Sequence, residues 1–207
     1  MSNEAVLSEE IVDQIADSLA QDGYIILPNF LTDDVTQQLY QHVHSLPKEQ
    51  FKPAGIGRNN ELHLNQQIRN DHTHWLSNGS SAEQVYLSIM DECRLQLNRR
   101  LFLSLVDYEA HFAHYASGSY YQRHIDAFHG RSNRVVTTVF YLNPQWSKQD
   151  GGELVIYSPD SDDVLHRVSP KLGTMVIFLS ERFPHEVLPA KSDRYSIAGW
   201  FRIDKAL

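Results

Sequence analysis

The sequence predicts an α+β fold that is mainly β, in which N-terminal helices back an antiparallel sandwich or barrel. Apolar residues recur at helical spacing in the first hundred residues. From residue 105 onward, short runs rich in Val, Ile, Tyr, Phe and Thr alternate with turns. Because no helical segment separates these runs, a parallel sheet is not expected. At 207 residues the chain is expected to be one domain, 1–207, with residues 1–104 as helical support and 105–203 as the core.

The helices are predicted by amphipathic patterns and by the residues at their ends. Residues 8–22 place one apolar stripe after Ser8, a possible N-cap, and Gly23 follows as the stop. A second helix is expected to start at Thr32 and a third to cover residues 81–103. The stripe of the first helix consists of Ile11, Val12, Ile15, Ala16 and Leu19.

Strands are predicted where apolar runs lie between turn residues. Tyr24–Leu27 is a short apolar strand between the first two helices, and the second half holds several such runs, separated by Gly, Pro, Asn, Ser and Asp. Residues 51–75 are rich in Gly and Asn and lack a helical period, so short strands and loops are expected there.

Composition and charge exclude several classes of protein. The single cysteine, Cys93, cannot form an internal disulfide, and the first thirty residues carry acids where a signal peptide would be basic, so we expect a cytoplasmic protein. The longest apolar stretch, Met175–Leu179, is far too short to cross a bilayer. A net charge of −8 disfavours binding to nucleic acid. Neither a membrane nor a nucleic acid is therefore an expected partner.

One tripeptide, His124-Ile125-Asp126, is a candidate pair of metal ligands. With 11 histidines and 15 aspartates in 207 positions, chance alone supplies about 0.8 His-X-Asp tripeptides, so the motif is weak by itself. Its context strengthens it, because it falls among predicted strands, where residues two apart point to the same face. A third ligand is then required.

His185 is the candidate third ligand, since it directly follows Pro184 at the start of another short strand. Two histidines and one carboxylate on one side of an octahedral ion leave three positions open, which is the arrangement of non-haem Fe(II) oxygenases. Arg194 follows nine residues later, and a planar guanidinium suits a bidentate grip on a dicarboxylate.

Three longer stretches carry a resemblance to a known family. They are HYASGSYYQRHIDAFHGRSNRVVTTVFYLNP, then GGELVIY, then ERFPHEVLPAKSDRYSIAGWF. From about residue 105 to 203 their order and approximate spacing closely resemble the Fe(II)/2-oxoglutarate-dependent prolyl 4-hydroxylases, in particular bacterial relatives of the hypoxia-sensing prolyl hydroxylases.

The resemblance implies a fold, a metal and two co-substrates. The fold would be a double-stranded β-helix, or jelly roll, in the C-terminal half. Fe(II) would be held by His124, Asp126 and His185, with 2-oxoglutarate and O2 as co-substrates and ascorbate as the reductant. Arg194 would grip the distal carboxylate of 2-oxoglutarate, and Tyr141 would hydrogen-bond to the same group.

The resemblance also implies a tyrosine near the metal, for which this sequence offers three candidates. Tyr115 matches the family's tyrosine at this place, but the segment is one residue shorter than the family pattern. Tyr120 and Tyr121 are therefore competing candidates.

The resemblance also implies residues that contact the substrate. Arg134 and Trp200 match substrate-side positions, and residues of about 51–76 match a mobile loop that closes over a target peptide. The stretch IRNDHTHW in that loop would let Asp71 reach Arg134.

The function implied is hydroxylation of a prolyl residue in a cytosolic protein, with elongation factor Tu as a candidate target. Dependence on O2 would also allow oxygen sensing. Two alternatives stay open: the same chemistry on a small molecule or free amino acid, and a non-catalytic jelly-roll module that senses its ligands. The sequence leaves the oligomeric state undetermined.

Overall fold

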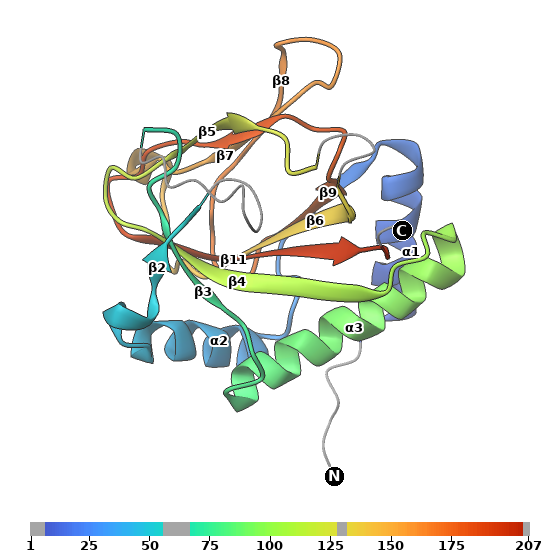
Figure 1. The fold of residues 1–207 in the computed structure, drawn as a ribbon, viewed down its shortest axis with the longest axis horizontal. Helices are drawn as coiled ribbons and strands as arrows, with labels where there is room; N and C mark the ends of the chain where they lie inside the picture. Colours follow the sequence, from blue (N-terminus) through green and yellow to red (C-terminus); the bar gives the residue numbers. More distant parts are fainter. Residues whose placement is uncertain (1–6, 56–66, 128–131, 205–207) are drawn as a thin grey trace.

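The computed structural model describes residues 7–55, 67–127 and 132–204, which form three layers (Figure 1). Helices cover one face of a seven-stranded sheet in this part of the chain, and a four-stranded sheet faces the other side. All strand pairs of the two sheets are antiparallel. The predicted α+β, mainly β fold is thus confirmed as a jelly roll supported by N-terminal helices.

The helices begin where the sequence places their caps. The side chain of Ser8 accepts a hydrogen bond from the Ile11 amide, and that of Thr32 accepts one from Val35. The third helix ends two residues earlier than expected, because Phe102 adopts the left-handed conformation with φ of 54°. The helices are α1 (Glu9–Gln21), α2 (Asp33–Ser45) and α3 (Ser81–Leu101), with short 3-10 turns η1 (Lys48–Gln50) and η3 (Lys148–Asp150).

The larger sheet has the strand order β1-β9-β6-β11-β4-β3-β2, and the smaller one has the order β5-β10-β7-β8. The strands of the larger sheet are β1 (Tyr24–Leu27), β2 (Lys52–Pro53), β3 (His72–Trp75), β4 (Asp107–Tyr115), β6 (Arg134–Tyr141), β9 (Met175–Leu179) and β11 (Arg194–Arg202). Those of the smaller sheet are β5 (Tyr121–His124), β7 (Leu154–Tyr157), β8 (Val164–Val168) and β10 (His185–Val187).

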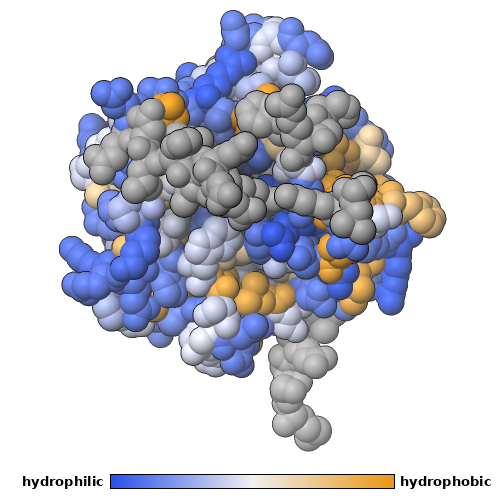
Figure 2. Space-filling model, viewed as in Figure 1, coloured by the Kyte–Doolittle hydropathy of each residue, from blue (hydrophilic) through white to orange (hydrophobic). Residues whose placement is uncertain are grey.

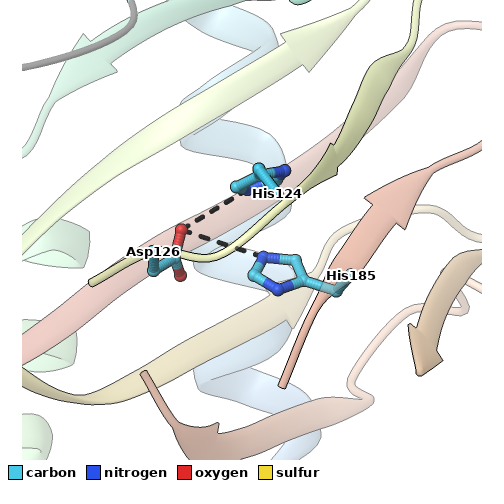
Figure 3. Close-up of side chains that lie close together, drawn as sticks. All are labelled: His124, Asp126 and His185. Atoms are coloured by element: carbon cyan, nitrogen blue, oxygen red, sulfur yellow. Dashed lines mark ion pairs between the residues drawn. The ribbon is translucent and has the colours of Figure 1, made fainter. Parts of the chain in front are cut away.

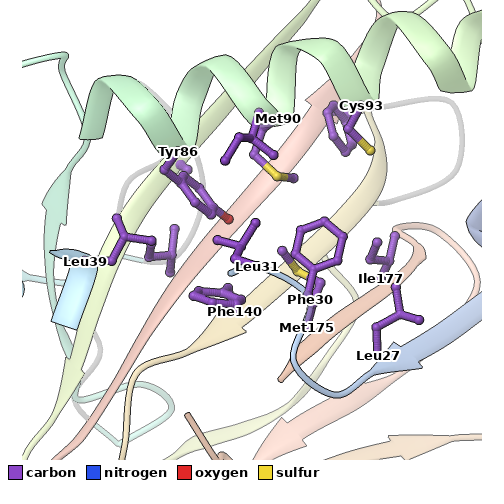
Figure 4. Packing of buried hydrophobic residues seen from close by; sticks show 14 of the residues in the cluster. Leu27, Phe30, Leu31, Leu39, Tyr86, Met90, Cys93, Phe140, Met175 and Ile177 are labelled. Carbon is purple, nitrogen blue, oxygen red and sulfur yellow. The ribbon is translucent and has the colours of Figure 1, made fainter. Parts of the chain in front are cut away.

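The larger sheet has a hydrophobic core on each face, one under the helices and one between the two sheets. Ile197 and Phe201 of β11 pack under the helices, together with Phe140 of β6 and the α3 side chains shown in Figure 4. Tyr141, next to Phe140, lies in a second cluster between the two sheets. Neighbouring residues of a strand point to opposite faces of the sheet. Each long strand can therefore place apolar side chains under the helices and other side chains in the space between the two sheets.

Cys93 is fully buried on α3, as expected for a residue that fills the core (Figure 4). Burial raises the pKa of its thiol to about 12, so it stays protonated and is no nucleophile.

The segment 51–76, for which the sequence predicts short strands and loops and the resemblance a mobile loop, contains two short strands among its described residues. Residues 72–75, which the resemblance placed in the mobile loop, form β3 and pair with β4. Residues 52–53 extend the sheet further as β2. The edge of β4 is available for this pairing, so the extended chain satisfies its backbone groups there instead of in water. The remainder of the expected loop, 56–66, lies outside the described residues.

Among the described residues, no helix is long and apolar enough to cross a bilayer. Among the coloured residues of the face shown in Figure 2, most are hydrophilic, and apolar ones gather in limited areas. This agrees with the short apolar stretches of the sequence.

Replacing Gly199 with alanine is expected to destabilise the fold by about 3 kcal/mol. A Cβ at this position would lie 2.1 Å from Tyr108 Oη and 2.5 Å from its Cζ, although Tyr108 is held by hydrogen bonds to Thr138 and Tyr86. Thermal unfolding should show a Tm lower by roughly 6–12 °C. Gly79→Ala is the control, since its new Cβ would come no closer than 3.5 Å to another side chain. Equal Tm values for the two variants would contradict the prediction.

Candidate metal and co-substrate site

The three predicted metal ligands lie together at one end of the smaller sheet (Figure 3). Asp126 Oδ1 is 3.4 Å from His124 Nε2 and 3.8 Å from His185 Nε2. His124 ends β5 and His185 begins β10, and the two residues face each other in the antiparallel pairing of these strands. This pairing explains why residues 61 positions apart in the sequence meet.

Asp126 reaches the site by a different route from the one expected. If the strand continued, His124 and Asp126 would point to the same face because they are two residues apart. However, β5 ends at His124 and the chain bends at Asp126. The carboxylate therefore converges on the histidines because of this bend.

Backbone hydrogen bonds fix how both imidazole rings are oriented. His124 Nδ1 lies 2.8 Å from the carbonyl oxygen of Gln122, and His185 Nδ1 lies 3.0 Å from that of Phe183. A ring that donates through Nδ1 keeps the Nε2 lone pair for a metal. Burial and the nearby His124 lower the pKa of His185 to about 4, so the neutral form needed for coordination persists at neutral pH.

Asp126 is a buried carboxylate that stays ionised. Burial alone would raise its pKa, but His185, His124 and a hydrogen bond from Trp200 together hold the pKa far below its usual value. Its Oδ2 atom accepts hydrogen bonds from Trp200 Nε1 at 3.0 Å and Thr137 Oγ1 at 2.8 Å. Its Oδ1 atom faces the histidines. One carboxylate oxygen and two imidazole nitrogens thus form a donor set that suits Fe(II).

Arg194 is buried without a carboxylate partner in the described parts of the chain. It is 1% exposed; its Nε donates to Gly152 O at 3.0 Å and its Nη1 to Ser196 Oγ at 3.4 Å. Its guanidinium carbon lies 4.9 Å from the ring centre of Tyr115 and 5.0 Å from that of Tyr141. An uncompensated buried charge is costly, so this arrangement suits an anionic ligand.

The Tyr141 hydroxyl strengthens this interpretation. It is buried, and within the described part of the chain it has no hydrogen-bond partner. Burial raises its pKa to about 12, which keeps the hydroxyl protonated and able to donate. Together with Arg194 it offers a buried cation and a hydroxyl donor to an anionic group.

The structure separates the three candidate tyrosines. Tyr115 lies beside Arg194, whereas the hydroxyl of Tyr120 donates to the carbonyl oxygen of Gln67. Tyr121 is stacked on His124, with ring centres 3.5 Å apart and planes 14° apart. Of these three candidates, Tyr121 is therefore the one whose ring contacts a predicted metal ligand, His124.

In this structure Asp71 and Arg134, which were expected to meet when the loop closes over a peptide, are paired with other residues. Asp71 accepts two hydrogen bonds from Arg69, at 2.6 and 2.9 Å. Arg134 instead donates to Glu109 at 2.8 Å and lies 3.5 Å from the ring centre of Trp200. Each charge thus has a nearer partner, one from the same short segment and one from a neighbouring part of the larger sheet.

Comparison with known proteins places this geometry in a family. The model of the 2OG-Fe(II) oxygenase superfamily matches residues 110–202. The crystal structure of a prolyl-4-hydroxylase from Pseudomonas putida has a TM-score of 0.85 and 37% identity, covering 94% of this chain and 100% of that one. The chain belongs to the prolyl 4-hydroxylase family of 2OG-Fe(II) oxygenases. The resemblance of the sequence motifs is thereby confirmed.

Other members of the prolyl 4-hydroxylase family match along most of this chain. Human Egl nine homolog 1 is 26% identical over 197 residues, which are 92% of this chain and 46% of that protein. The chain therefore spans about half the length of that relative. A prolyl hydroxylase from Trichoplax adhaerens, in complex with a hypoxia inducible factor peptide, has a TM-score of 0.81 and 29% identity, covering 94% of this chain and 90% of that one. Family membership and the His-Asp-His group together imply Fe(II) and 2-oxoglutarate.

Proposed function

We propose that this chain hydroxylates a prolyl residue in a cytosolic protein, consuming 2-oxoglutarate and O2 and releasing succinate and CO2. The proposal rests on a group of three metal-ligand side chains and a buried arginine with a tyrosine hydroxyl, which lie between the same two sheets. The three ligand atoms from His124, Asp126 and His185 lie within 4.8 Å of one another. The buried Arg194 and the hydroxyl of Tyr141, which has no hydrogen-bond partner among the described residues, lie between the same two sheets.

One group of residues would bind the metal and a second group would bind the co-substrate. His124, Asp126 and His185 would hold Fe(II), which when bound couples oxidative decarboxylation of 2-oxoglutarate to oxidation of a substrate carbon. Arg194 and Tyr141 would bind the distal carboxylate and so fix how the co-substrate lies before O2 arrives. Tyr115, packed beside Arg194, would lie next to the same carboxylate.

A short segment before β3 covers the metal side of the site. The amide of Gln122 donates to the carbonyl oxygen of Ile68 at 2.9 Å, which attaches this segment to β5. The guanidinium carbon of Arg69 lies 4.6 Å from the ring centre of Tyr121, which in turn covers His124. These layers would exclude water from the reacting centre.

Exposed aromatic surface beside the site suits a peptide. Trp75 is 50% exposed and packs on His111, which contacts Trp200. Aromatic surfaces bind proline-containing segments well. A relative from Trichoplax adhaerens binds a hypoxia inducible factor peptide, which supports a protein substrate here. We propose that Trp200 and Arg134 border the substrate, that Asp71 orders the covering segment through Arg69, and that elongation factor Tu is the first target to test.

The test is mass spectrometry of a cytosolic lysate incubated with Fe(II), ascorbate, 2-oxoglutarate and either the natural chain or its His185→Ala variant. We expect a one-oxygen mass gain on a proline only with the natural chain. Consumption of 2-oxoglutarate without any modified protein would favour a small-molecule substrate. If nothing is consumed, the non-catalytic sensor replaces the proposal.

A further inference from the structure

Two side chains of the larger sheet converge on the same oxygen of Asp126. Thr137 on β6 and Trp200 on β11 stand opposite each other in the pairing of these strands. Both are buried, and both donate to Oδ2, at 2.8 Å from Thr137 Oγ1 and 3.0 Å from Trp200 Nε1. The register of the larger sheet therefore determines which oxygen of Asp126 is occupied.

Further contacts fix the orientation of each donor. The hydroxyl of Thr137 has one proton, and a carboxylate cannot donate, so that proton belongs to the bond with Asp126. Ser180 Oγ, 2.9 Å away, is then the donor to Thr137. The guanidinium of Arg134 lies 3.5 Å from the ring centre of Trp200 and donates to Glu109. Neither donor can turn away without breaking a second contact.

Asp126 depends on these donors more than the histidines do. His124 and His185 are oriented by backbone carbonyls of their own segments. Asp126 lies in a bend after β5, and the two donors to its Oδ2 among the described residues both come from the other sheet. A carboxylate that can rotate presents either oxygen or both to a cation, whereas one with Oδ2 occupied presents Oδ1 alone.

We propose that Thr137 and Trp200 are positioning residues that hold Asp126 Oδ1 toward the metal and thereby set metal affinity. Ser180 supports this role by orienting Thr137. The inference rests on the proposed function in one respect, namely that the three ligands bind a divalent metal. It also gives Trp200 a role in addition to bordering the substrate.

The experiment compares two neighbouring threonines of β6. Thr137→Val keeps the shape of the side chain but removes the donor to Asp126. Thr138→Val is the matched control, because its hydroxyl is equally buried but bonds to Tyr108 on the helix side of the sheet. Binding of Mn(II) alone to the metal-free full chain is measured by electron paramagnetic resonance of free Mn(II). Thermal unfolding establishes that each variant is folded.

We expect Thr137→Val to weaken Mn(II) binding at least about 10-fold, and Trp200→Phe to do the same. Thr137→Ser, which restores the hydroxyl, should bind within about twofold of the natural chain, as should Thr138→Val. Unchanged affinity in Thr137→Val, or equal losses in the two valine variants, would overturn the inference.

The His185→Ala variant separates this inference from the proposed function. If the natural chain binds Mn(II) no better than His185→Ala, the metal site itself fails, and the positioning role fails with it. If His185→Ala loses affinity while Thr137→Val retains it, only the positioning role is overturned.

Discussion

Replacing His185 with alanine is expected to abolish consumption of 2-oxoglutarate while the protein keeps its fold. The change removes one of the three ligand atoms grouped within 4.8 Å, and two ligands do not define the same side of an octahedral ion. The structural cost is moderate, because the change removes ring contacts with His124 and Phe178, whose centres are 4.3 and 4.9 Å away, and the hydrogen bond to the carbonyl oxygen of Phe183. Together these are worth about 2 kcal/mol, so the Tm should fall by roughly 4–8 °C while the fold is kept.

His166→Ala is the matched control for this prediction. His166 lies on β8 opposite Ile156, and His185 lies opposite the same residue from the other side. His166 Nε2 is 2.8 Å from the hydroxyl of Tyr24 and takes no part in the metal group. Its variant should turn over 2-oxoglutarate normally with succinate as the measured product. Residual turnover in His185→Ala, or circular dichroism showing global unfolding, would contradict the assigned role.

The fold could be predicted from the sequence because its signals are local. Ser8 and Thr32 are capping residues, and the apolar runs between turns mark strands. Short strands were expected between residues 51 and 75, and β3 is one of them, but its pairing with β4 could not be predicted because it is a long-range contact. Local pattern shows that a segment is extended but does not identify its neighbour in the sheet.

The metal ligands could be predicted, whereas several contacts around them could not. The His-X-Asp motif and the distant His185 are visible in the sequence, but the pairing of Asp71 with Arg69 depends on which charge lies nearest in space. The position of Thr137 carries a usable signal in the sequence. It lies four residues before Tyr141 on the same predicted strand, and an even separation places both side chains on the interior face.

Replacing Arg194 with methionine is expected to weaken binding of 2-oxoglutarate by about 100-fold or more. Each hydrogen bond from the guanidinium to a carboxylate is worth about 1.5–3 kcal/mol, and 1.4 kcal/mol corresponds to a tenfold change in affinity. In the presence of Mn(II), 2-oxoglutarate should raise the Tm of the natural chain but not that of the variant. Tyr141→Phe, which loses one neutral donor worth about 1 kcal/mol, should weaken binding only about fivefold to tenfold.

The affinity of Arg194→Met for Mn(II) alone shows whether the variant has lost only its contact with 2-oxoglutarate or whether the metal site is also disturbed. Arg194 has no hydrogen bond or ion pair with the three metal ligands among the described residues, so Arg194→Met should bind Mn(II) as the natural chain does. Its buried charge lacks a carboxylate partner in that part of the chain, so removal of the charge relieves a desolvation cost that only an anionic ligand would offset. A variant that still binds 2-oxoglutarate tightly would show that the dicarboxylate lies elsewhere. If the variant also binds Mn(II) more weakly, Arg194 is needed to maintain the structure of the metal site.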